Sequence, residues 1–356
     1  MRRIIKSAIT ALVLTLVFSI LTACSTTSSG SDQSEEEKTL TFWTHNSGPM
    51  VEQTKELIEK YEAENPHITI DYQSMPNDQF AEKTVVALGT STGPDVLLVS
   101  DRNIPTFVSK GVLKPVDPEA FGFDNLEALM DDWIGSSLDG LMQDEQLYAI
   151  PMEFNSFNLF INTKAFEEAG LDPEHDIPKT WDELAEVASK LTIREDGRLV
   201  QAGFAWPMFN GGWEALVIDP MVRQLGGSLI EDYGTEAYFD SPEVQQVFQT
   251  WQDMYHQYEV MDIGFGTHSA ANPNQSFIDS QLAMWISGPW AIPMITKESE
   301  VYEHYKGVPL PSYDPNHPVT TLYSWNWAVN SETQYPEEAW KFVNYLSSHQ
   351  KEWLEN

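Results

Sequence analysis

The sequence predicts an α/β protein whose globular part forms two lobes. About 318 residues follow position 38, which is more than one hydrophobic core usually organises. Strand-like segments such as 39–44 and 67–72 alternate with helical segments such as 49–66. The run DVLLVS at 95–100 is apolar from Val96 to Val99, as in a strand covered on both faces. Strands that alternate with helices favour a mainly parallel sheet.

Helix-start signals mark further elements in the second half of the chain. Thr180 and Glu183 have the spacing of a capping box, in which each side chain bonds the backbone of the other residue. Ser241 is a candidate N-cap, and Pro242 stands at the first helical position, where its missing N–H is harmless. The segment 335–354 has the periodicity of an amphipathic helix. These signals predict helices on both sides of the second lobe's strands.

The N-terminal residues have the pattern of a secretory signal. Arg2, Arg3 and Lys6 precede an almost wholly apolar run, 7–23. We expect residues 1–23 to be a signal peptide that is removed. The alternative is a retained transmembrane helix, although the apolar run is barely long enough to span a bilayer.

The one cysteine of the chain, Cys24, follows directly. Leu21-Thr22-Ala23-Cys24 resembles the lipobox of bacterial lipoproteins, in which the cysteine receives a diacylglyceryl group and becomes the first mature residue. A lone thiol cannot form an intramolecular disulfide, so lipidation is the expected role of Cys24. Residues 24–38 are rich in Ser, Thr and acidic residues and form a flexible leash in this interpretation. The protein is therefore expected on the extracellular face of the bacterial cytoplasmic membrane, held by its lipid.

The charge balance is strongly acidic. The formal net charge of the chain is −34, and removing the three positive charges of the signal peptide takes −34 to −37. Nucleic acids and anionic membrane surfaces are polyanions that would repel such a protein. We expect neither as a partner.

Motifs for metal binding, cofactor binding and catalysis are absent from the sequence. The eight histidines lie more than ten residues apart, and no second cysteine can join one in a metal site. No G-x-S-x-G, P-loop or complete dinucleotide fingerprint occurs. The 54 acidic residues will form carboxylate pairs by chance, so such pairs are weak support for a glycosidase. The sequence predicts a protein that is not an enzyme and has no metal or cofactor.

Several tryptophans lie near predicted turns, among Gly, Pro, Asn and Ser neighbours. Indole rings can stack on sugar rings while amides and carboxylates bond the hydroxyls, so this combination is typical of carbohydrate sites. Each tryptophan taken singly can also be a large core residue. The tryptophans concerned are Trp206, Trp213, Trp290, Trp325 and Trp327.

At these segments the chain resembles the extracellular solute-binding proteins of bacterial ABC sugar importers, the maltose-binding-protein-like group. The likeness spans roughly residues 39–350 and follows the family order. It is carried by five stretches: LTFWT (40–44), TGPDVLLVSDRNIPTFVSKGVLKPVD (92–117), LYAIPMEFNSFNLFINTKAFEEAGLD (147–172) with PKTWDEL (178–184), QLAMWISGPWAI (281–292) and YSWNWAVN (323–330) with PEEAWKFVNYL (336–346). The alternative to membership of this family is an unrelated α/β lipoprotein.

The resemblance implies a type II periplasmic-binding-protein-like fold, with a ligand cleft between two lobes that close by a hinge movement. Family members commonly continue beyond the 336–346 segment, so the second lobe is expected to be truncated or to close early. The implied segments are 39–149 plus 306–328 for the first lobe and 153–300 plus 331–356 for the second, with crossings near Ile150, Tyr302 and Asn330.

The resemblance also implies ligand-binding residues, which follow predicted strands or lie in loops. Asp101 and Arg102 match an acidic–basic pair that bonds sugar hydroxyls in the family, and Trp290 matches its stacking tryptophan. A surface ion pair at Asp101 and Arg102, and a hinge tether at Glu153, are the alternatives. The implied set is His45, Asn46, Ser47, Asp101, Arg102, Glu153, Asn155, Trp213, Gly288, Trp290 and Trp325.

The leading hypothesis is a lipid-anchored, monomeric receptor that binds a sugar, as an oligosaccharide, and presents it to the transmembrane subunits of an ABC importer, with ATP hydrolysed by partner subunits. One alternative keeps the fold and changes the ligand to a polyamine, a metal complex or a phosphoester. Another is a secreted carbohydrate hydrolase, which would need positioned acid–base groups such as Glu153.

Overall fold

The structure is a computed structural model whose internal contacts divide the chain into a leading unit, Met1–Lys38, and a globular unit, Thr39–Asn356. Only residues 36–38 of the leading unit are described, so Cys24, the signal peptide and most of the leash lie outside the described residues. The described residues are 36–46, 49–90, 92–134, 137–205, 211–230, 236–261 and 273–350.

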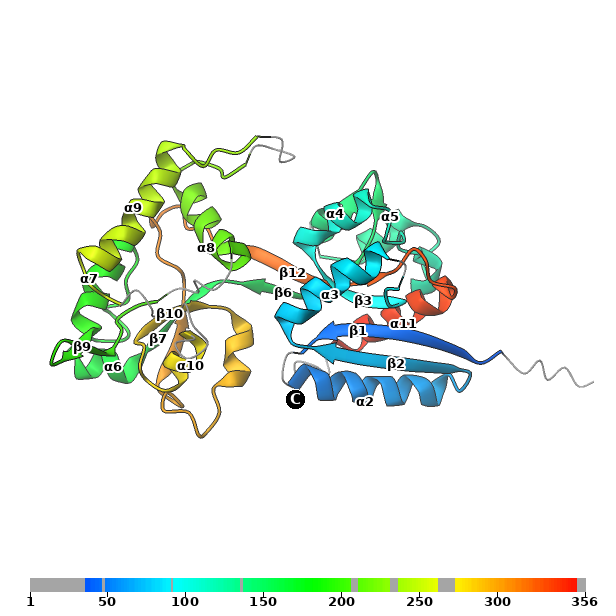
Figure 1. Cartoon of the computed structure of the whole chain (residues 1–356), viewed down its shortest axis with the longest axis horizontal. Helices are drawn as coiled ribbons and strands as arrows, with labels where there is room; N and C mark the ends of the chain where they lie inside the picture. The colour runs from blue at the N-terminus through cyan, green and yellow to red at the C-terminus, as the bar shows by residue number, and fades with distance from the viewer. Residues whose placement is uncertain are drawn as a thin grey trace, which may run out of the picture. The chain divides into compact units, whose positions relative to one another are not determined.

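A five-stranded sheet forms the centre of the first lobe (Figure 1). Its strands, in spatial order, are β2 (Ile68–Met75), β1 (Lys38–His45), β3 (Val96–Ser100), β12 (Leu322–Val329) and β6 (Ile150–Ser156). Every residue of β3 is buried, as its apolar sequence predicts for a central strand covered on both faces. β1 pairs with β3 in parallel, with Phe42 opposite Val96.

One strand departs from the mainly parallel sheet that the sequence predicts. β12 runs antiparallel to both of its neighbours, with Trp325 opposite Ser100 of β3 and opposite Glu153 of β6. The reason is that β12 is a returning strand: it enters the sheet only after the chain has built the second lobe. Alternation of elements along the sequence does not reveal this.

Helices cover this sheet through apolar faces. Met50, Thr54, Leu57 and Tyr61 form the buried face of the long helix after β1, as their spacing predicts. The helices of the first lobe are α2 (Pro49–Glu64), α3 (Asn77–Gly89), α4 (Ile104–Ser109), α5 (Leu126–Asp131) and α11 (Pro336–Ser348), with short 3₁₀ turns η1 (Asp101–Asn103), η2 (Pro118–Phe121) and η3 (Asp139–Leu141) and the small hairpin β4 (Met142–Gln143) and β5 (Gln146–Leu147).

The second lobe contains a smaller antiparallel sheet. Its strands, in spatial order, are β10 (Met284–Ser287), β7 (Asn158–Asn162) and β11 (Tyr305–Val308). Its other elements are α6 (Thr163–Glu168), α7 (Trp181–Leu191), β8 (Ile193–Glu195), β9 (Arg198–Gln201), α8 (Gly211–Gln224), α9 (Pro242–His256), α10 (Pro273–Ile278) and the 3₁₀ helix η6 (Pro289–Met294).

Both predicted helix caps of the second lobe are confirmed. The Glu183 amide donates to Thr180 Oγ1 over 3.1 Å, and the Thr180 amide donates to Glu183 Oε2 over 3.2 Å. Ser241 Oγ accepts from the Val244 amide at 3.3 Å at the start of α9. Caps of this kind satisfy donors that the first helical turn leaves unpaired, so short sequence signals suffice to place these helix starts.

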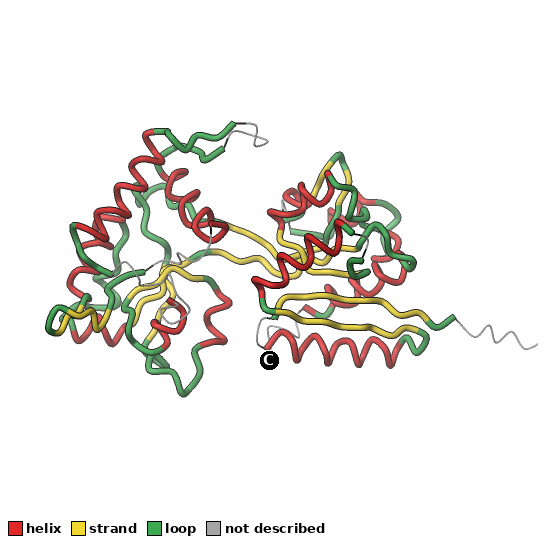
Figure 2. The backbone as a smooth tube through the Cα atoms, in the orientation of Figure 1, coloured by secondary structure: helices red, strands yellow, loops and turns green. Residues whose placement is uncertain are grey.

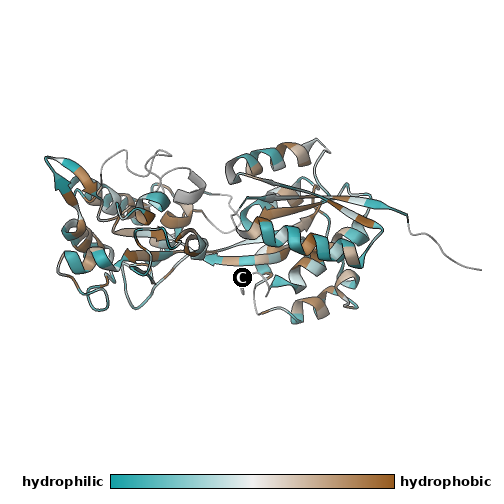
Figure 3. Ribbon diagram, turned by 90° about the horizontal axis from the view of Figure 1, so that it is seen from below, coloured by the Kyte–Doolittle hydropathy of each residue, from teal (hydrophilic) through white to brown (hydrophobic). Residues whose placement is uncertain are grey.

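Two separate hydrophobic cores define the lobes, and hydrophobic residues gather inside each of them in Figure 3. The first core includes Phe42 of β1, Trp327 of β12 and Trp340 of α11. The second includes Phe160 of β7 and Trp181 of α7. Each lobe therefore has its own buried centre, as the chain length predicts.

The membership of the two cores differs from the expected boundaries in two places. The segment 331–356 was expected in the second lobe, but helix α11 within it packs in the first core, where Phe342 lies 5.2 Å from Phe42 between ring centroids. The segment 306–328 was expected in the first lobe, but Val308, Leu310 and Tyr323 belong to the second core. The pairing of β11 with β7 and the return along β12 cause both differences.

The described chain crosses between the cores along β6 and β12, which run side by side (Figures 1 and 2). On β6 the crossing lies between Met152 and Phe157, a few residues beyond the expected Ile150. On β12 it lies between Tyr323 and Trp327, not near Tyr302 or Asn330. The residues around Tyr302 stay within the second core and those around Asn330 within the first.

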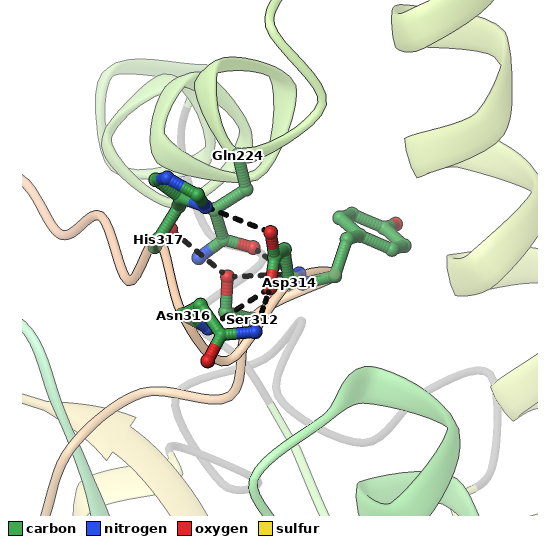
Figure 4. A network of polar contacts seen from close by, with 6 residues as sticks. Gln224, Ser312, Asp314, Asn316 and His317 are labelled. Atoms are coloured by element: carbon green, nitrogen blue, oxygen red, sulfur yellow. Dashed lines mark hydrogen bonds and ion pairs between the residues drawn. The ribbon is translucent and has the colours of Figure 1, made fainter.

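A polar network lies where the segment that leads into β12 meets the end of α8; Figure 4 shows Gln224 beside the turn of Ser312, Asp314, Asn316 and His317. Gln224, at the end of α8, donates from Nε2 to Pro311 O at 3.1 Å and to Val319 O at 3.0 Å. Its Oε1 accepts from Trp181 Nε1 at 2.9 Å and from the Tyr313 amide at 3.3 Å. All four hydrogen-bonding positions of this buried amide are therefore used.

Candidate functional site

The first group of candidate residues follows β3. Asp101 and Arg102 form the start of η1, with Asp101 half-buried and Arg102 exposed. Asp101 Oδ1 accepts from Ser100 Oγ at 3.1 Å and from the Arg102 amide at 2.8 Å. Its Oδ2 accepts from the Ser324 amide of β12 at 3.0 Å. The Asp101 carboxylate therefore joins the end of β3 to β12.

His45, the last residue of β1, lies among aromatic rings. It is only 7% exposed, and its ring centroid lies 4.5 Å from that of Trp325 and 6.1 Å from that of Phe80 on α3. Burial lowers the His45 pKa from 6.5 to about 4, so the imidazole is neutral at pH 7. Its Nε2 is buried and has no hydrogen-bond partner among the described residues. A buried polar atom in this state is costly unless something else bonds it.

The two predicted site residues that follow His45 in the sequence are Asn46 and Ser47. Asn46 is exposed, and its amide donates to Met75 O. Ser47 lies outside the described residues, so the expectation for it stays a prediction.

Glu153 and Asn155 lie on β6, opposite two aromatic residues of β12. Glu153 pairs with Trp325, and Asn155 pairs with Tyr323. Residues two apart on a strand share a face, so these four side chains form one polar and aromatic surface. Asn155 Nδ2 donates to Glu153 Oε1 at 2.8 Å. Burial raises the pKa of the Glu153 carboxyl, and the Asn155 bond partly opposes that shift.

Trp290 extends this surface from the second lobe. Its ring centroid lies 5.9 Å from that of Tyr323 and 5.5 Å from that of Phe157. Gly288, the N-cap of η6, allows this placement, because a Cβ built at Gly288 would lie 1.8 Å from Trp290 Cζ3. Gly288 therefore positions an aromatic ring in the structure. Trp213 lies on α8, but its side chain is outside the described set.

These residues converge along one strand, β12. Strand pairing, a hydrogen bond and ring contacts bring Glu153, Asn155, Asp101, His45 and Trp290 to residues 323–325 of β12. Burial raises the Tyr323 pKa. We call the following set the β12 cluster: His45, Phe80, Asp101, Arg102, Glu153, Asn155, Trp290, Tyr323 and Trp325.

Two members of the β12 cluster were not predicted. Tyr323 could have been found, since the alternation in LYSWNWAV (322–329) puts it on the same strand face as Trp325. Phe80 has no local signal, because an apolar residue on an amphipathic helix is indistinguishable from core.

The chemistry available to the β12 cluster is that of binding. It combines indole faces with a neutral imidazole, an amide, two carboxylates and one guanidinium. Within the described ranges no group of three or more His, Cys, Asp or Glu residues could hold a metal ion. Nor does any described helix have both the length and the apolar character that crossing a membrane requires.

Comparison with known proteins agrees with this fold. The model of the bacterial extracellular solute-binding protein family matches residues 47–353, and the chain belongs to that family. An ABC transporter solute-binding protein from Thermotoga lettingae, solved with α-D-tagatose, superposes with a TM-score of 0.78 and 26% identity, covering 89% of this chain and 79% of that one. Maltose-bound MalE3 of T. maritima has a TM-score of 0.75 at 20% identity, covering 88% and 79%.

Curated relatives match over shorter stretches. A putative binding protein of Brucella abortus (strain 2308) is 28% identical over 163 residues, 46% of this chain and 37% of the relative. The sn-glycerol-3-phosphate-binding periplasmic protein UgpB of Escherichia coli K12 is 29% identical over 161 residues, 43% of this chain and 35% of the relative. The chain thus spans just over a third of the length of these relatives. The Thermotoga lettingae protein and both curated relatives are binding proteins by name, and the two-lobed fold is the one that the sequence predicts.

Proposed function

We propose that this protein captures a carbohydrate at the β12 cluster and delivers it to the transmembrane subunits of an ABC importer, whose ATPase subunits supply the energy. The observation that carries the proposal is His45 Nε2, a buried polar atom that has no hydrogen-bond partner in the described part of the chain and is set among aromatic rings. A sugar hydroxyl is small and neutral, and it can donate to or accept from an imidazole nitrogen.

The surroundings of His45 suit the same ligand. Trp325 and Trp290 are both half-buried, so part of each indole remains accessible. An indole face packs well against the C–H face of a sugar ring. Glu153, Asn155 and Arg102 supply acceptors and donors for its hydroxyls. We propose an oligosaccharide, because Trp290 lies on the second lobe and Trp325 at the crossing, packed against both cores, so that the two indoles offer separate stacking surfaces.

Relatives support both this ligand and a competing one. The Thermotoga lettingae protein was solved with a monosaccharide, whereas UgpB is named for a phosphoester. A phosphate bound at the β12 cluster would be repelled by the carboxylates of Glu153 and Asp101. Only one guanidinium of the cluster, that of Arg102, would attract it. Burying an anion beside carboxylates is unfavourable. A neutral saccharide avoids this repulsion, and a polyamine would face repulsion from Arg102.

A ligand panel tests the proposal. Purified mature protein is titrated by calorimetry and thermal melting with neutral mono- and oligosaccharides, glycerol 3-phosphate and spermidine. A saccharide at a hundred times its Kd should add about 2.7 kcal/mol to the unfolding free energy. Trp325→Ala should abolish most of this gain, whereas Trp133→Ala, at a half-buried indole of the first core, should leave it. Tighter binding of glycerol 3-phosphate than of any saccharide would overturn the assignment.

The protein acts as a binder and not as a hydrolase in this proposal. The competing activity predicts release of reducing sugar from an oligosaccharide, and that release would disappear in Glu153→Gln. We expect no product from either the wild type or the variant.

Anchoring through Cys24 completes the proposal. The lipid would hold a monomer at the extracellular face of the cytoplasmic membrane. Cys24→Ser should move the protein from the membrane fraction to the medium without changing its ligand affinity. Membrane association that survives this substitution would favour a retained N-terminal helix.

A further inference from the structure

The two ends of β12 are tied to different lobes. On the second-lobe side, Thr320 Oγ1 donates to Phe157 O at 2.9 Å, and Thr321 Oγ1 donates to Leu216 O at 2.7 Å. On the first-lobe side, the Ser324 amide donates to Asp101. Only Leu322 and Tyr323 lie between these attachments.

Asp101 extends the pairing of β12 with β3 beyond the end of β3. The last register pair of the two strands is Trp325 with Ser100. The Ser324 amide comes one residue later along β12, where β3 has already turned into η1. The carboxylate of Asp101 provides the acceptor that a longer β3 would have provided with its backbone.

The orientation of this carboxylate is fixed from its own side. Oδ1 is held by Ser100 Oγ and by the Arg102 amide, which leaves Oδ2 directed at Ser324. Deeper in the first lobe, Asn326 Nδ2 donates to Val99 O at 3.1 Å. Thus β3 and η1 hold β12 at Ser324 and Asn326. Their attachment stops at the step from Ser324 to Tyr323, beyond which β12 stays paired with β6 alone, Tyr323 with Asn155 and Leu322 with Ser156.

We infer that Asp101 is a positioning residue of the hinge: its bond to the Ser324 amide confines bending of β12 to Leu322–Tyr323. Without the bond, the attachment of β12 to β3 would begin only at the Trp325–Ser100 pair, and the stretch free of β3 would extend to Ser324, the residue next to Trp325. Hinges work through a few residues that absorb the backbone change, so the length of the free stretch sets the range of lobe positions. This inference rests on the two-lobed fold, and only its ligand arm rests on the proposed function.

The test measures distances between lobes without any ligand. Spin labels are placed on cysteines at Val86 of α3 and Val200 of β9, which are 65% and 46% exposed, in a mature Cys24→Ser protein. Asp101→Ala should raise the population of displaced distances about tenfold, as expected for loss of a charge-assisted hydrogen bond. Asp101→Asn keeps one oxygen, which can accept either from the Ser324 amide or from the Arg102 amide but not from both, so its distribution should lie between those of the wild type and Asp101→Ala.

A matched control separates the hinge from general destabilisation. Asp117 is the N-cap of η2, another 3₁₀ turn of the first lobe, and its carboxylate accepts from the Glu119 amide at 3.1 Å. Asp117→Ala should leave the distance distribution unchanged. An unchanged distribution in Asp101→Ala, or one equally broadened in Asp101→Asn, overturns the inference.

Measuring saccharide binding by the same variants separates this inference from the proposed function. If a saccharide binds, Asp101→Ala should slow its capture more than Asp101→Asn does. If no saccharide binds, the proposed function fails while the ligand-free distances still decide the role of Asp101.

Discussion

Gln224 and His45 are both buried polar residues, one in each lobe, and they differ in how their hydrogen bonds are satisfied. Gln224 uses every position of its amide, with donors from Trp181 and Tyr313 and acceptors at Pro311 and Val319. His45 has a buried Nε2 with no partner among the described residues. A satisfied buried network stabilises and rigidifies a fold, whereas an unsatisfied one lowers stability.

The difference separates a structural site from a candidate binding site. The Gln224 network fixes the segment that leads into β12, so its polar atoms are used for folding. The His45 nitrogen contributes nothing of this kind, and it lies beside Trp325 in the β12 cluster. Unsatisfied buried groups that persist in a protein commonly mark function.

The largest expected effect is on stability, and it comes from removing the fully hydrogen-bonded amide of Gln224. Gln224→Leu leaves two donors and two acceptors unpaired, and at about 1 kcal/mol each it should lower the unfolding free energy by about 4 kcal/mol. Urea denaturation measures the change. Gln249→Leu is the control: this exposed glutamine donates from Nε2 to Asp253 Oδ1 at 2.7 Å on the same helix, so its replacement should change stability by less than about 0.5 kcal/mol. A loss below about 1 kcal/mol in Gln224→Leu would show that the network is not structural.

The next effect concerns the pH dependence set by His45. Its folded pKa of about 4 lies below the unfolded value of 6.5, so the folded state disfavours the proton. Stability from this residue is present above pH 6.5 and is lost as the pH falls toward 4. The difference in unfolding free energy between wild type and His45→Gln should fall by about 2.5 kcal/mol from pH 7.5 to pH 4.5. A difference that stays constant with pH would mean that His45 is not desolvated.

A third effect, on ligand affinity, tests whether the surroundings of His45 bind a ligand. Trp325→Ala removes the ring that packs on His45 and should weaken saccharide binding about thirtyfold, or about 2 kcal/mol. Calorimetry measures the affinity, and Trp325→Phe should recover part of it. Equal affinities in all three proteins would remove Trp325 from the site.

The smallest effect tests the placement of Trp290. Gly288→Ala puts a methyl group where the Trp290 ring lies, and displacing the ring should weaken binding about fivefold, or about 1 kcal/mol. Gly140→Ala is the matched control, because no atom lies within 4 Å of its added Cβ. Fluorescence titration reports both, and an effect at Gly140 as large as at Gly288 would contradict the steric explanation.

Local elements were predictable because their determinants are neighbours in the sequence. The capping box of Thr180 and Glu183 and the cap at Ser241 act over three residues. The burial of β3 follows from its uniform apolar composition. The assignment of α11 to the second lobe was wrong because its partners, such as Phe42, lie some three hundred residues earlier.

The candidate site was predictable to a similar extent. His45, Asp101 and Glu153 were found because they end or follow predicted strands or begin a crossing, and the structure brings them to β12. Their binding roles stay predictions. Tyr323 and Phe80 were missed, and the Asp101 bond to Ser324 could not be foreseen, since it joins residues 223 positions apart.

By itself, the sequence determined the signal pattern with its cysteine, the acidic balance, the helix caps and the α/β class, because each depends on composition or on contacts within a few residues. Only the tertiary structure decided which lobe each segment joins, the direction of β12 and the meeting of His45 with Trp325. Those outcomes depend on strand pairing and packing between distant segments. Such contacts leave no local trace, because any strand of suitable pattern could have paired in their place.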